Sequence, residues 1–301
     1  MISRTDIEFQ AQDGVTLRGW LFVPPDDGTK RPAITMAHGF GAVKEHCLER
    51  FARAFAEAGF VVLVHDHRSF GSSDGLPRQD VDPWKQIDDW RHAISFLASR
   101  PEVDNDRIGL WGTSYSGGHA FILGATDRRL KCIVSQVPTI SGFEQGRRRV
   151  HSDAQSAFID LLSEDLYAQH RGEKPRTQSI VSAEPAELAA YRAQEAIDFY
   201  LQPISESSWK NSVTLRSTFA ARMYEPGIWA ARVSPTPLLM VVAAQDTLTL
   251  TDLELDAFEK ALHPKRLALI PGGHFAPYAA AFETACGAAV TWFTEHLGAT
   301  Q

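Results

Sequence analysis

The sequence predicts an α/β protein built on a mostly parallel, doubly wound β-sheet. Apolar segments of strand length alternate with amphipathic segments of helix length, first over residues 32–138 and again from residue 237 onward. Such alternation is typical of βαβ units, whose parallel strands are covered by helices on both faces. Residues 139–233 break the alternation and predict a mostly helical insertion. The expected organisation is a core of residues 1–138 and 234–301, with residues 139–233 as a cap.

Length and composition exclude several classes of protein. A chain of 301 residues that is 44% hydrophobic and 22% charged can bury a sizeable core. Its net charge of −7 gives no electrostatic support for binding nucleic acid or an anionic membrane. The N-terminus "MISRTDIEFQ" lacks the apolar core of a signal peptide, and no apolar run is long enough to span a membrane. Three widely spaced cysteines fit no disulfide or zinc pattern. We therefore expect a soluble cytoplasmic protein.

The first strands and helix of the core follow from local pattern. Residues 7–24 contain two strand-like segments, "IEFQA" and "VTLRGWLFV", around a "QDG" turn that requires positive φ at Gly14. The segments "PAITMAHG" (32–39) and "FVVLVHDH" (60–67) are apolar enough to be strands buried on both faces. The segment between them, "CLERFARAFAEAG", predicts an amphipathic helix that ends at Gly59.

The remaining elements complete the alternation. The helix predicted over residues 83–100 opens with proline in its first turn and ends before Pro101. It is followed by the strand "RIGLWG", by a short apolar helix from Tyr115 and by the strand "KCIVSQVP" (131–138). After the insertion we expect strands over 237–246 and 266–273, a helix between them over 251–262, and a C-terminal helix through "AAVTWFTEHL".

Three chemically complementary side chains each follow a predicted strand. Ser114 comes after "RIGLW", Asp246 after "PLLMVVAA" and His274 after "RLALI". Chemistry in open parallel sheets lies beyond the carboxyl ends of the strands, and this chain order is typical of a serine held on a sharp strand-to-helix turn. A serine hydroxyl needs a base with a pKa near neutrality, and an aspartate fixes the tautomer of that base. The sequence therefore predicts Ser114 as nucleophile, His274 as base and Asp246 as its partner.

The turn "GTSYSGG" contains a second serine. A sharp turn of this kind needs small residues two positions on either side of the nucleophile. Gly112 supplies one, and Ser116 occupies the other position, where glycine is more usual. Ser116 is thus a competing nucleophile, although Ser114 directly follows the strand. The oxyanion hole is expected to use the backbone N–H groups of Tyr115 and of Phe40 in the loop "HGFGAVKE".

Other polar residues near these strands are expected to have supporting roles. His38 is expected to brace the oxyanion loop, and Arg147–Arg149 to form a solvated helix face. The pair His65 and His67 has metal-ligand spacing but no third ligand nearby, so we expect no metal site. Three carboxylates are interpreted as helix-start and surface charges: Asp252, Glu254 and Asp256.

Five blocks of the sequence together resemble the α/β-hydrolase superfamily. The blocks are "HGFGAVKE", "HDHRSFGSSDGLPRQDVDPWKQIDDWRHAISFL", "RIGLWGTSYSGGHA", "KCIVSQVP" and "PGGHFAPY". More narrowly, they resemble the branch that includes fungal polyketide transferases and their bacterial hydrolase relatives, described as dienelactone-hydrolase-like or Xaa-Pro-peptidase-like. The resemblance implies an α/β-hydrolase fold with an eight-stranded sheet and a cap between strands six and seven. It also implies the triad Ser114, Asp246 and His274, and no cofactor.

These observations predict a serine hydrolase that cleaves a small-molecule carboxylic ester, thioester or lactone through an acyl-enzyme. One alternative is a polyketide-type acyltransferase, in which an alcohol replaces water. Another is a non-catalytic binding protein, which would not need Asp246 and His274 together. Among the aromatic residues of the cap, Trp209, Tyr224 and Trp229 are candidates for substrate binding or simply for packing the cap. A homodimer is compatible with the sequence.

Overall fold

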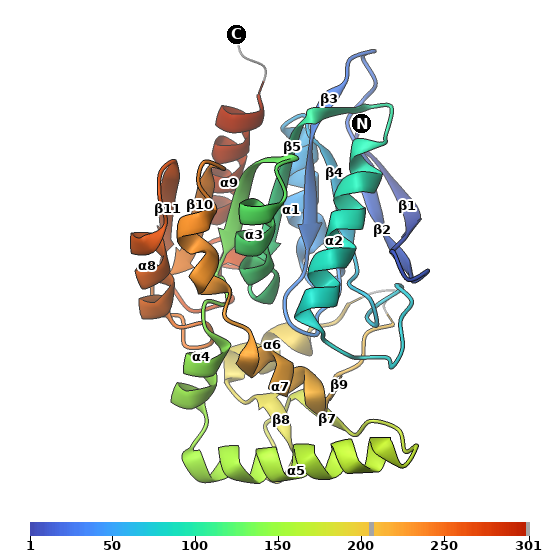
Figure 1. The fold of residues 1–301 in the computed structure, drawn as a ribbon. Coiled ribbons are helices and arrows are strands. Elements are labelled where there is room, and N and C mark those ends of the chain that lie inside the picture. The colour runs from blue at the N-terminus through green and yellow to red at the C-terminus, as the bar shows by residue number, and fades with distance from the viewer. Residues whose placement is uncertain (205–207, 299–301) are drawn as a thin grey trace.

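The core of the protein is one eight-stranded sheet in the order β1-β2-β4-β3-β5-β6-β10-β11 (Figure 1). It is seen in a computed structural model that describes residues 1–204 and 208–298. The strands are β1 (Ser3–Gln10), β2 (Thr16–Val23), β3 (Arg31–Ala37), β4 (Val61–His65), β5 (Val103–Thr113), β6 (Leu130–Gln136), β10 (Leu238–Ala243) and β11 (Lys265–Ile270). The strands from β4 to β11 in this order are parallel to one another, and β2 pairs antiparallel with both β1 and β4. The predicted mostly parallel sheet and N-terminal hairpin are confirmed, with φ of 78° at Gly14.

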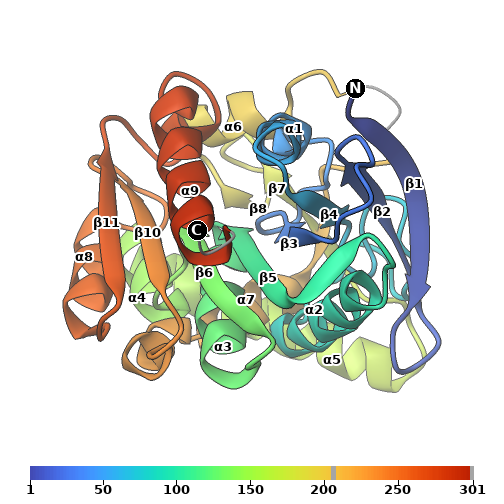
Figure 2. The ribbon, with the colours of Figure 1, turned by 90° about the horizontal axis from the view of Figure 1, so that it is seen from above.

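Helices cover both faces of this sheet. The helices α1 (Leu48–Glu57) and α9 (Phe282–Leu297) lie on one face, and α2 (Pro83–Ala98), α3 (Tyr115–Thr126) and α8 (Thr251–Lys260) lie on the other (Figure 2). Alternate residues of β4 face the two layers: Val62 and Val64 belong to the core with α1 and α9, and Val61 and Leu63 to the opposite core. Because both faces are buried, the strands are apolar throughout instead of alternating with polar residues.

The chain leaves the sheet after β6 and returns to it at β10, the sixth and seventh of its strands in chain order. We call residues 139–233 the inserted segment, which lies below the sheet in Figure 1. Its elements are α4 (Gly142–Arg149), α5 (Ser152–His170), β7 (Thr177–Val181), β8 (Ala189–Tyr191), α6 (Gln194–Tyr200), β9 (Val213–Thr214), α7 (Leu215–Met223) and the 3₁₀ helix η1 (Pro226–Arg232).

Beside its helices, the inserted segment contains strands that the sequence does not predict, since β8, β7 and β9 form a small sheet. These strands have three, five and two residues, which is too short for an alternating pattern to show in the sequence. The function of the inserted segment as a cap remains a prediction. Within the described ranges, no helix combines the length and the apolarity that crossing a membrane requires.

Candidate active site

Ser114 lies on the sharp turn between β5 and α3. Its backbone has φ of 56° and ψ of −117°, a conformation that a residue with a side chain rarely adopts. The turn also leaves no room for larger neighbours. A Cβ atom at Gly112 would overlap the carbonyl oxygen of Ser116, and one at Gly39 would lie 2.9 Å from the Ser114 Cβ. The small residues around Ser114 are therefore required by the close approach of the backbone on both sides.

The fold brings together the three residues that the sequence singles out. The Ser114 Oγ lies 3.0 Å from His274 Nε2, and His274 Nδ1 lies 2.7 Å from Asp246 Oδ2. His274 and Asp246 are buried, with exposed fractions of 1% and 5%. A histidine whose Nδ1–H donates to a carboxylate has its Nε2 lone pair free to accept a proton from serine. The arrangement is thus capable of activating the Ser114 hydroxyl.

The Asp246 carboxylate is held by four hydrogen bonds. Its Oδ1 accepts from the backbone N–H groups of Leu248 at 2.8 Å and Thr249 at 2.9 Å, and its Oδ2 accepts from the Thr249 hydroxyl at 2.7 Å and from His274. Burial raises the pKa of Asp246, but the neighbouring His274 and these hydrogen bonds outweigh burial and hold the pKa below its usual value. Asp246 is therefore ionised at neutral pH, as a partner of the imidazolium must be.

A second carboxyl group, Glu254, lies behind Asp246, and the expectation that it is a surface charge is wrong. Glu254 is fully buried on α8, and its Oε1 lies 3.0 Å from the Thr249 hydroxyl. Burial, followed by the nearby Asp246, raises the pKa of Glu254 well above its usual value, so this side chain is neutral. The signal for burial is its spacing from Leu250 and Ala257, which places it on the apolar stripe of the helix.

The loop after β3, which carries Phe40, closely approaches Ser114 at Gly39. The carbonyl of the peptide that joins Gly39 to Phe40 lies 2.9 Å from His38 Nδ1 and accepts from the Ala42 N–H at 3.3 Å. Because the carbonyl and the N–H of one peptide point in opposite directions, these contacts turn the Phe40 N–H away from them. The bracing role expected of His38 is consistent with this geometry. Tyr115 is the first residue of α3, so its N–H lies outside the helical hydrogen-bond ladder.

The inserted segment also holds this loop. The Tyr200 hydroxyl donates to the Phe40 carbonyl at 2.6 Å, and the Trp209 indole N–H donates to the Gly41 carbonyl at 2.8 Å. At the far end of the loop, the Lys44 ammonium lies 2.6 Å from Asp66 Oδ2. Phe40, which carries one of the two candidate oxyanion donors, therefore lies in a loop that is fixed at several carbonyl groups, whereas Tyr115 lies on α3.

The second serine of the turn has different partners from the first. The Ser116 hydroxyl donates to the His38 carbonyl at 2.5 Å and lies 2.8 Å from His67 Nε2. Burial, followed by the neighbouring histidines, lowers the pKa of His67 well below its usual value, so His67 is neutral. In the described parts of the chain, no group of three or more potential ligands is placed to hold a metal ion. Ser116 thus holds the loop after β3 at the His38 carbonyl, from the core side.

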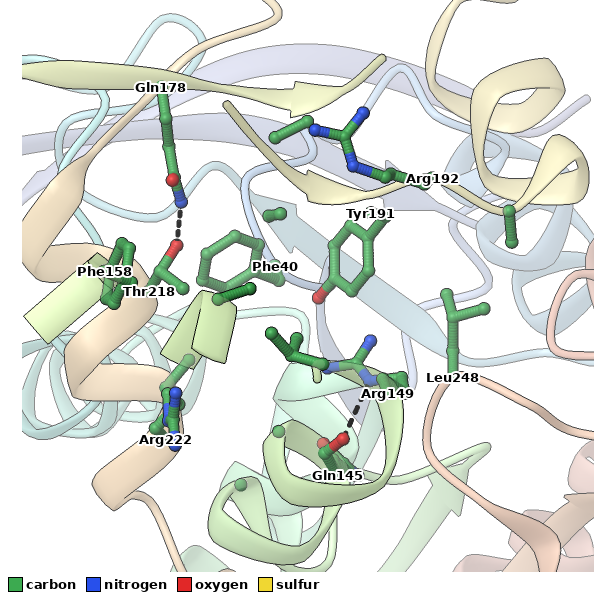
Figure 3. Close-up of a pocket in the computed structure, with 18 of the residues that line it drawn as sticks. Phe40, Gln145, Arg149, Phe158, Gln178, Tyr191, Arg192, Thr218, Arg222 and Leu248 are labelled. Carbon is green, nitrogen blue, oxygen red and sulfur yellow. Dashed lines mark hydrogen bonds between the residues drawn. The ribbon is translucent and has the colours of Figure 1, made fainter. Parts of the chain in front are cut away.

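Two cavities adjoin these residues. The smaller has a volume of about 20 Å³ and is lined by Ser114 and His274, among others. The larger has a volume of about 500 Å³, is lined by Phe40 and Tyr115 on the core side, and is otherwise bounded mostly by the inserted segment (Figure 3). Tyr191 and Leu248 line both cavities. The larger cavity is therefore adjacent to the candidate oxyanion donors.

The three aromatic residues proposed as substrate contacts do not line these two cavities. Trp209 holds the oxyanion loop, as described above. The Tyr224 hydroxyl lies 2.7 Å from His119 Nδ1, and its ring packs against Tyr115 with centroids 5.0 Å apart. The Trp229 ring lies under the guanidinium of Arg232 at 4.9 Å. The contacts of all three favour the packing interpretation, and their effect on selectivity remains a prediction.

Comparison with known proteins gives a consistent result. A family model described as X-Pro dipeptidyl-peptidase (S15 family) matches residues 13–276. The thiohydrolase aneE of Aspergillus aculeatus is 32% identical over 270 residues, which cover 87% of this chain and 83% of that protein. The polyketide transferase ATR5 of Stachybotrys chlorohalonatus is 30% identical over 275 residues, with 89% of each chain covered.

The crystal structure of the α/β hydrolase GrgF from a Penicillium species superposes with a TM-score of 0.84. The two chains are 26% identical, and the match covers 99% of this chain and 100% of GrgF. The α/β-hydrolase fold predicted from the sequence is thus confirmed. Together, the relatives support hydrolase or acyltransferase activity.

Proposed function

The chain belongs to the X-Pro dipeptidyl-peptidase (S15) family, and we propose that within it the chain is a serine hydrolase of small-molecule esters, thioesters or lactones. The observation that supports this best is the buried, hydrogen-bonded series Ser114, His274 and Asp246. It stands at the carboxyl ends of three strands, where Tyr115 follows Ser114 and the loop that carries Phe40 approaches Ser114 at Gly39. We propose esters and thioesters as substrates, and not peptides, because the similar proteins are named thiohydrolases and polyketide transferases.

In the proposed mechanism, the Ser114 oxygen attacks the substrate carbonyl carbon while His274 Nε2 takes the hydroxyl proton. The carbonyl oxygen becomes an oxyanion that accepts hydrogen bonds from the N–H groups of Phe40 and Tyr115. Collapse of this intermediate expels the alcohol or thiol, to which His274 returns the proton, and leaves an acyl group on Ser114. Water then attacks the acyl group, again with His274 as base, and the free acid is released.

An acyltransferase shares the first half of this reaction, and one of the similar proteins carries that name. The two functions differ in the acceptor that reaches the acyl-enzyme. Water is the acceptor in the reaction for which the similar thiohydrolase aneE is named. Hydrolysis is therefore the proposed reaction, with acyl transfer to an alcohol as the second candidate.

Product partitioning tests this proposal. The purified protein is given a p-nitrophenyl ester or the matching thioester, with and without millimolar primary alcohols. We expect release of nitrophenol or thiol, with the acyl group recovered as free acid. Recovery of most of the acyl group as a new ester, at a rate that saturates with alcohol, would establish the transferase. Absence of turnover with every ester, thioester and lactone tested would contradict both.

A further inference from the structure

The larger cavity is lined by positively charged side chains and by no carboxylate. None of its lining residues is an aspartate or a glutamate. Three of them are arginines, namely Arg149, Arg192 and Arg222. The charge of these lining residues is thus opposite in sign to the net charge of the chain, which is −7. In Figure 3 the three side chains come from different sides of the cavity, with Arg149 beside Tyr191.

The hydrogen-bond partners of these arginines are neutral. Arg149 Nε donates to the Gln145 carbonyl at 3.2 Å, an Arg192 terminal nitrogen to the Glu184 carbonyl at 2.8 Å, and an Arg222 terminal nitrogen to Gln155 Oε1 at 2.8 Å. Over residues 1–204 and 208–298, none of the three forms an ion pair with a carboxylate. Their charges therefore add to the positive potential of the cavity.

The arginines before Arg149 on the same helix behave differently. Arg147 and Arg148 of α4 both pair with Glu144, and Arg148 also pairs with Asp252. These two form the solvated face that the sequence predicts. Arg149 is exposed as well, but it follows Gln145 by four residues, on the side of α4 that lines the cavity. The expectation of solvated arginines thus agrees with the exposure of all three, and Arg149 lines the cavity in addition.

Arg149 lies near Tyr191, a residue that lines both the larger cavity and the cavity at Ser114. Its guanidinium lies 5.2 Å from the centre of the Tyr191 ring. Tyr191 lines both the cavity at Ser114 and the larger cavity, and its ring is 5.9 Å from that of Phe40. A substrate that extends from Ser114 into the larger cavity thus passes Tyr191 and reaches Arg149.

We propose that the substrate carries an anionic oxygen group, a carboxylate or a phosphate, in the part that occupies the larger cavity, and that Arg149 binds it. Arg192 and Arg222 strengthen the attraction from the other walls. This inference rests on the proposed function, since it names a feature of the substrate of the same site. A guanidinium is suited to the task because its fork of N–H donors matches the geometry of both anions.

The test compares matched substrates that differ in one charge. In the acyl arm, p-nitrophenyl monoesters of dicarboxylic acids are compared with the same compounds after methylation of the free carboxylate. In the thiol arm, thioesters of one neutral acyl group with phosphopantetheine are compared with those of N-acetylcysteamine. We expect the wild-type kcat/KM to favour the anionic member of one arm by about 10- to 100-fold, the size expected of a charge-assisted hydrogen bond. The arm that shows the preference identifies carboxylate or phosphate.

Variants test whether Arg149 causes the preference for the anionic substrate. Arg149→Gln is expected to reduce the anionic-to-neutral ratio of kcat/KM to near one, and Arg149→Lys to retain part of it. Arg147→Gln is the matched control, because Arg147 stands on the same helix and is paired with Glu144; it should leave the ratio unchanged. The inference would be overturned if Arg149→Gln still preferred the anionic substrate. It would also be overturned if wild type turned over the anionic and the neutral substrate at equal rates in both arms.

A binding measurement separates this inference from the proposed function. Calorimetry with the Ser114→Ala variant compares a dicarboxylic acid monoamide and phosphopantetheine with neutral analogues of equal length. Tighter binding of an anionic member, lost in the Ser114→Ala/Arg149→Gln double variant, supports the inference even if no ester is turned over. Turnover of neutral esters with no preference for the anion in rates or binding contradicts the inference and leaves the proposed function intact.

Discussion

Replacing Asp246 with asparagine is expected to invert the hydrogen bonding of His274 without changing the size of any side chain. The backbone N–H groups of Leu248 and Thr249 both donate to Oδ1 at 2.8 and 2.9 Å. They will keep an amide oxygen at that position, so the amide nitrogen takes the place of Oδ2. That nitrogen then faces His274 Nδ1, which is 2.7 Å from Oδ2 in the native protein. Two donors cannot face each other, so the proton of His274 moves to Nε2.

The expected loss of kcat follows from the distance between His274 Nε2 and the Ser114 oxygen. With the proton on Nε2, His274 donates toward the Ser114 oxygen 3.0 Å away and can no longer accept its proton. A triad with the wrong tautomer loses about 10⁴ in kcat, which is roughly 5.4 kcal/mol at 1.36 kcal/mol for each factor of ten. KM should change little, because Asp246 lines neither of the two cavities.

The assay is the steady-state hydrolysis of a p-nitrophenyl ester by wild type, Asp246→Asn and Asp252→Asn. The last variant is the matched control, because Asp252 is a largely exposed carboxylate of the same region, paired with Arg148. It should retain wild-type kcat. An Asp246→Asn variant within about tenfold of the wild-type kcat would refute the reasoning, and would indicate that another group orients His274.

Three further outcomes are expected. Because the pKa of Glu254 is raised in the folded protein, the fold binds more protons than the unfolded chain above pH 4.5, and stability falls as pH rises. Glu254→Gln should therefore gain free energy of unfolding relative to wild type as pH rises from 4.5 in denaturant titrations; a pH-independent difference would contradict a buried neutral carboxyl. Ser116→Ala should lose about 1–3 kcal/mol of stability, because the His38 carbonyl loses its donor, yet a fluorophosphonate should still label Ser114; loss of labelling with an intact fold would make Ser116 the nucleophile. Gly39→Ala should lower kcat by roughly 10²-fold, because the new Cβ would lie 3.2 Å from the Ser114 Oγ; unchanged kcat would show that the loop tolerates displacement.

The fold was largely predictable because its strands are buried on both faces. Continuous apolar segments such as residues 60–67 have few interpretations in a chain of this length, and their alternation with helices specifies a parallel sheet. The inserted segment was less predictable. Its two-residue strand β9 exists because Gln178 of β7 pairs with Val213 across a long sequence separation, and no local pattern encodes such a pairing.

The candidate triad was predictable for a related reason. Ser114, Asp246 and His274 each follow a strand of one parallel sheet, so the topology alone places them at the same edge. The supports of the oxyanion loop could not be found this way. Tyr200 and Trp209 lie about 160 residues from the carbonyls that they hold, and only the packing of the inserted segment brings them together. Glu254 was misinterpreted because a charged residue is normally assigned to solvent, although helical spacing places it on an inward face.

The most direct test of the central claim is to trap the acyl-enzyme and locate the acyl group. The protein is mixed with a slowly hydrolysed ester or thioester, quenched in acid during turnover, digested and analysed by mass spectrometry. The account predicts one modified peptide, with the mass of the acyl group on Ser114, and no modification in Ser114→Ala. An acyl group on Ser116 instead, or turnover that continues in Ser114→Ala, would contradict it.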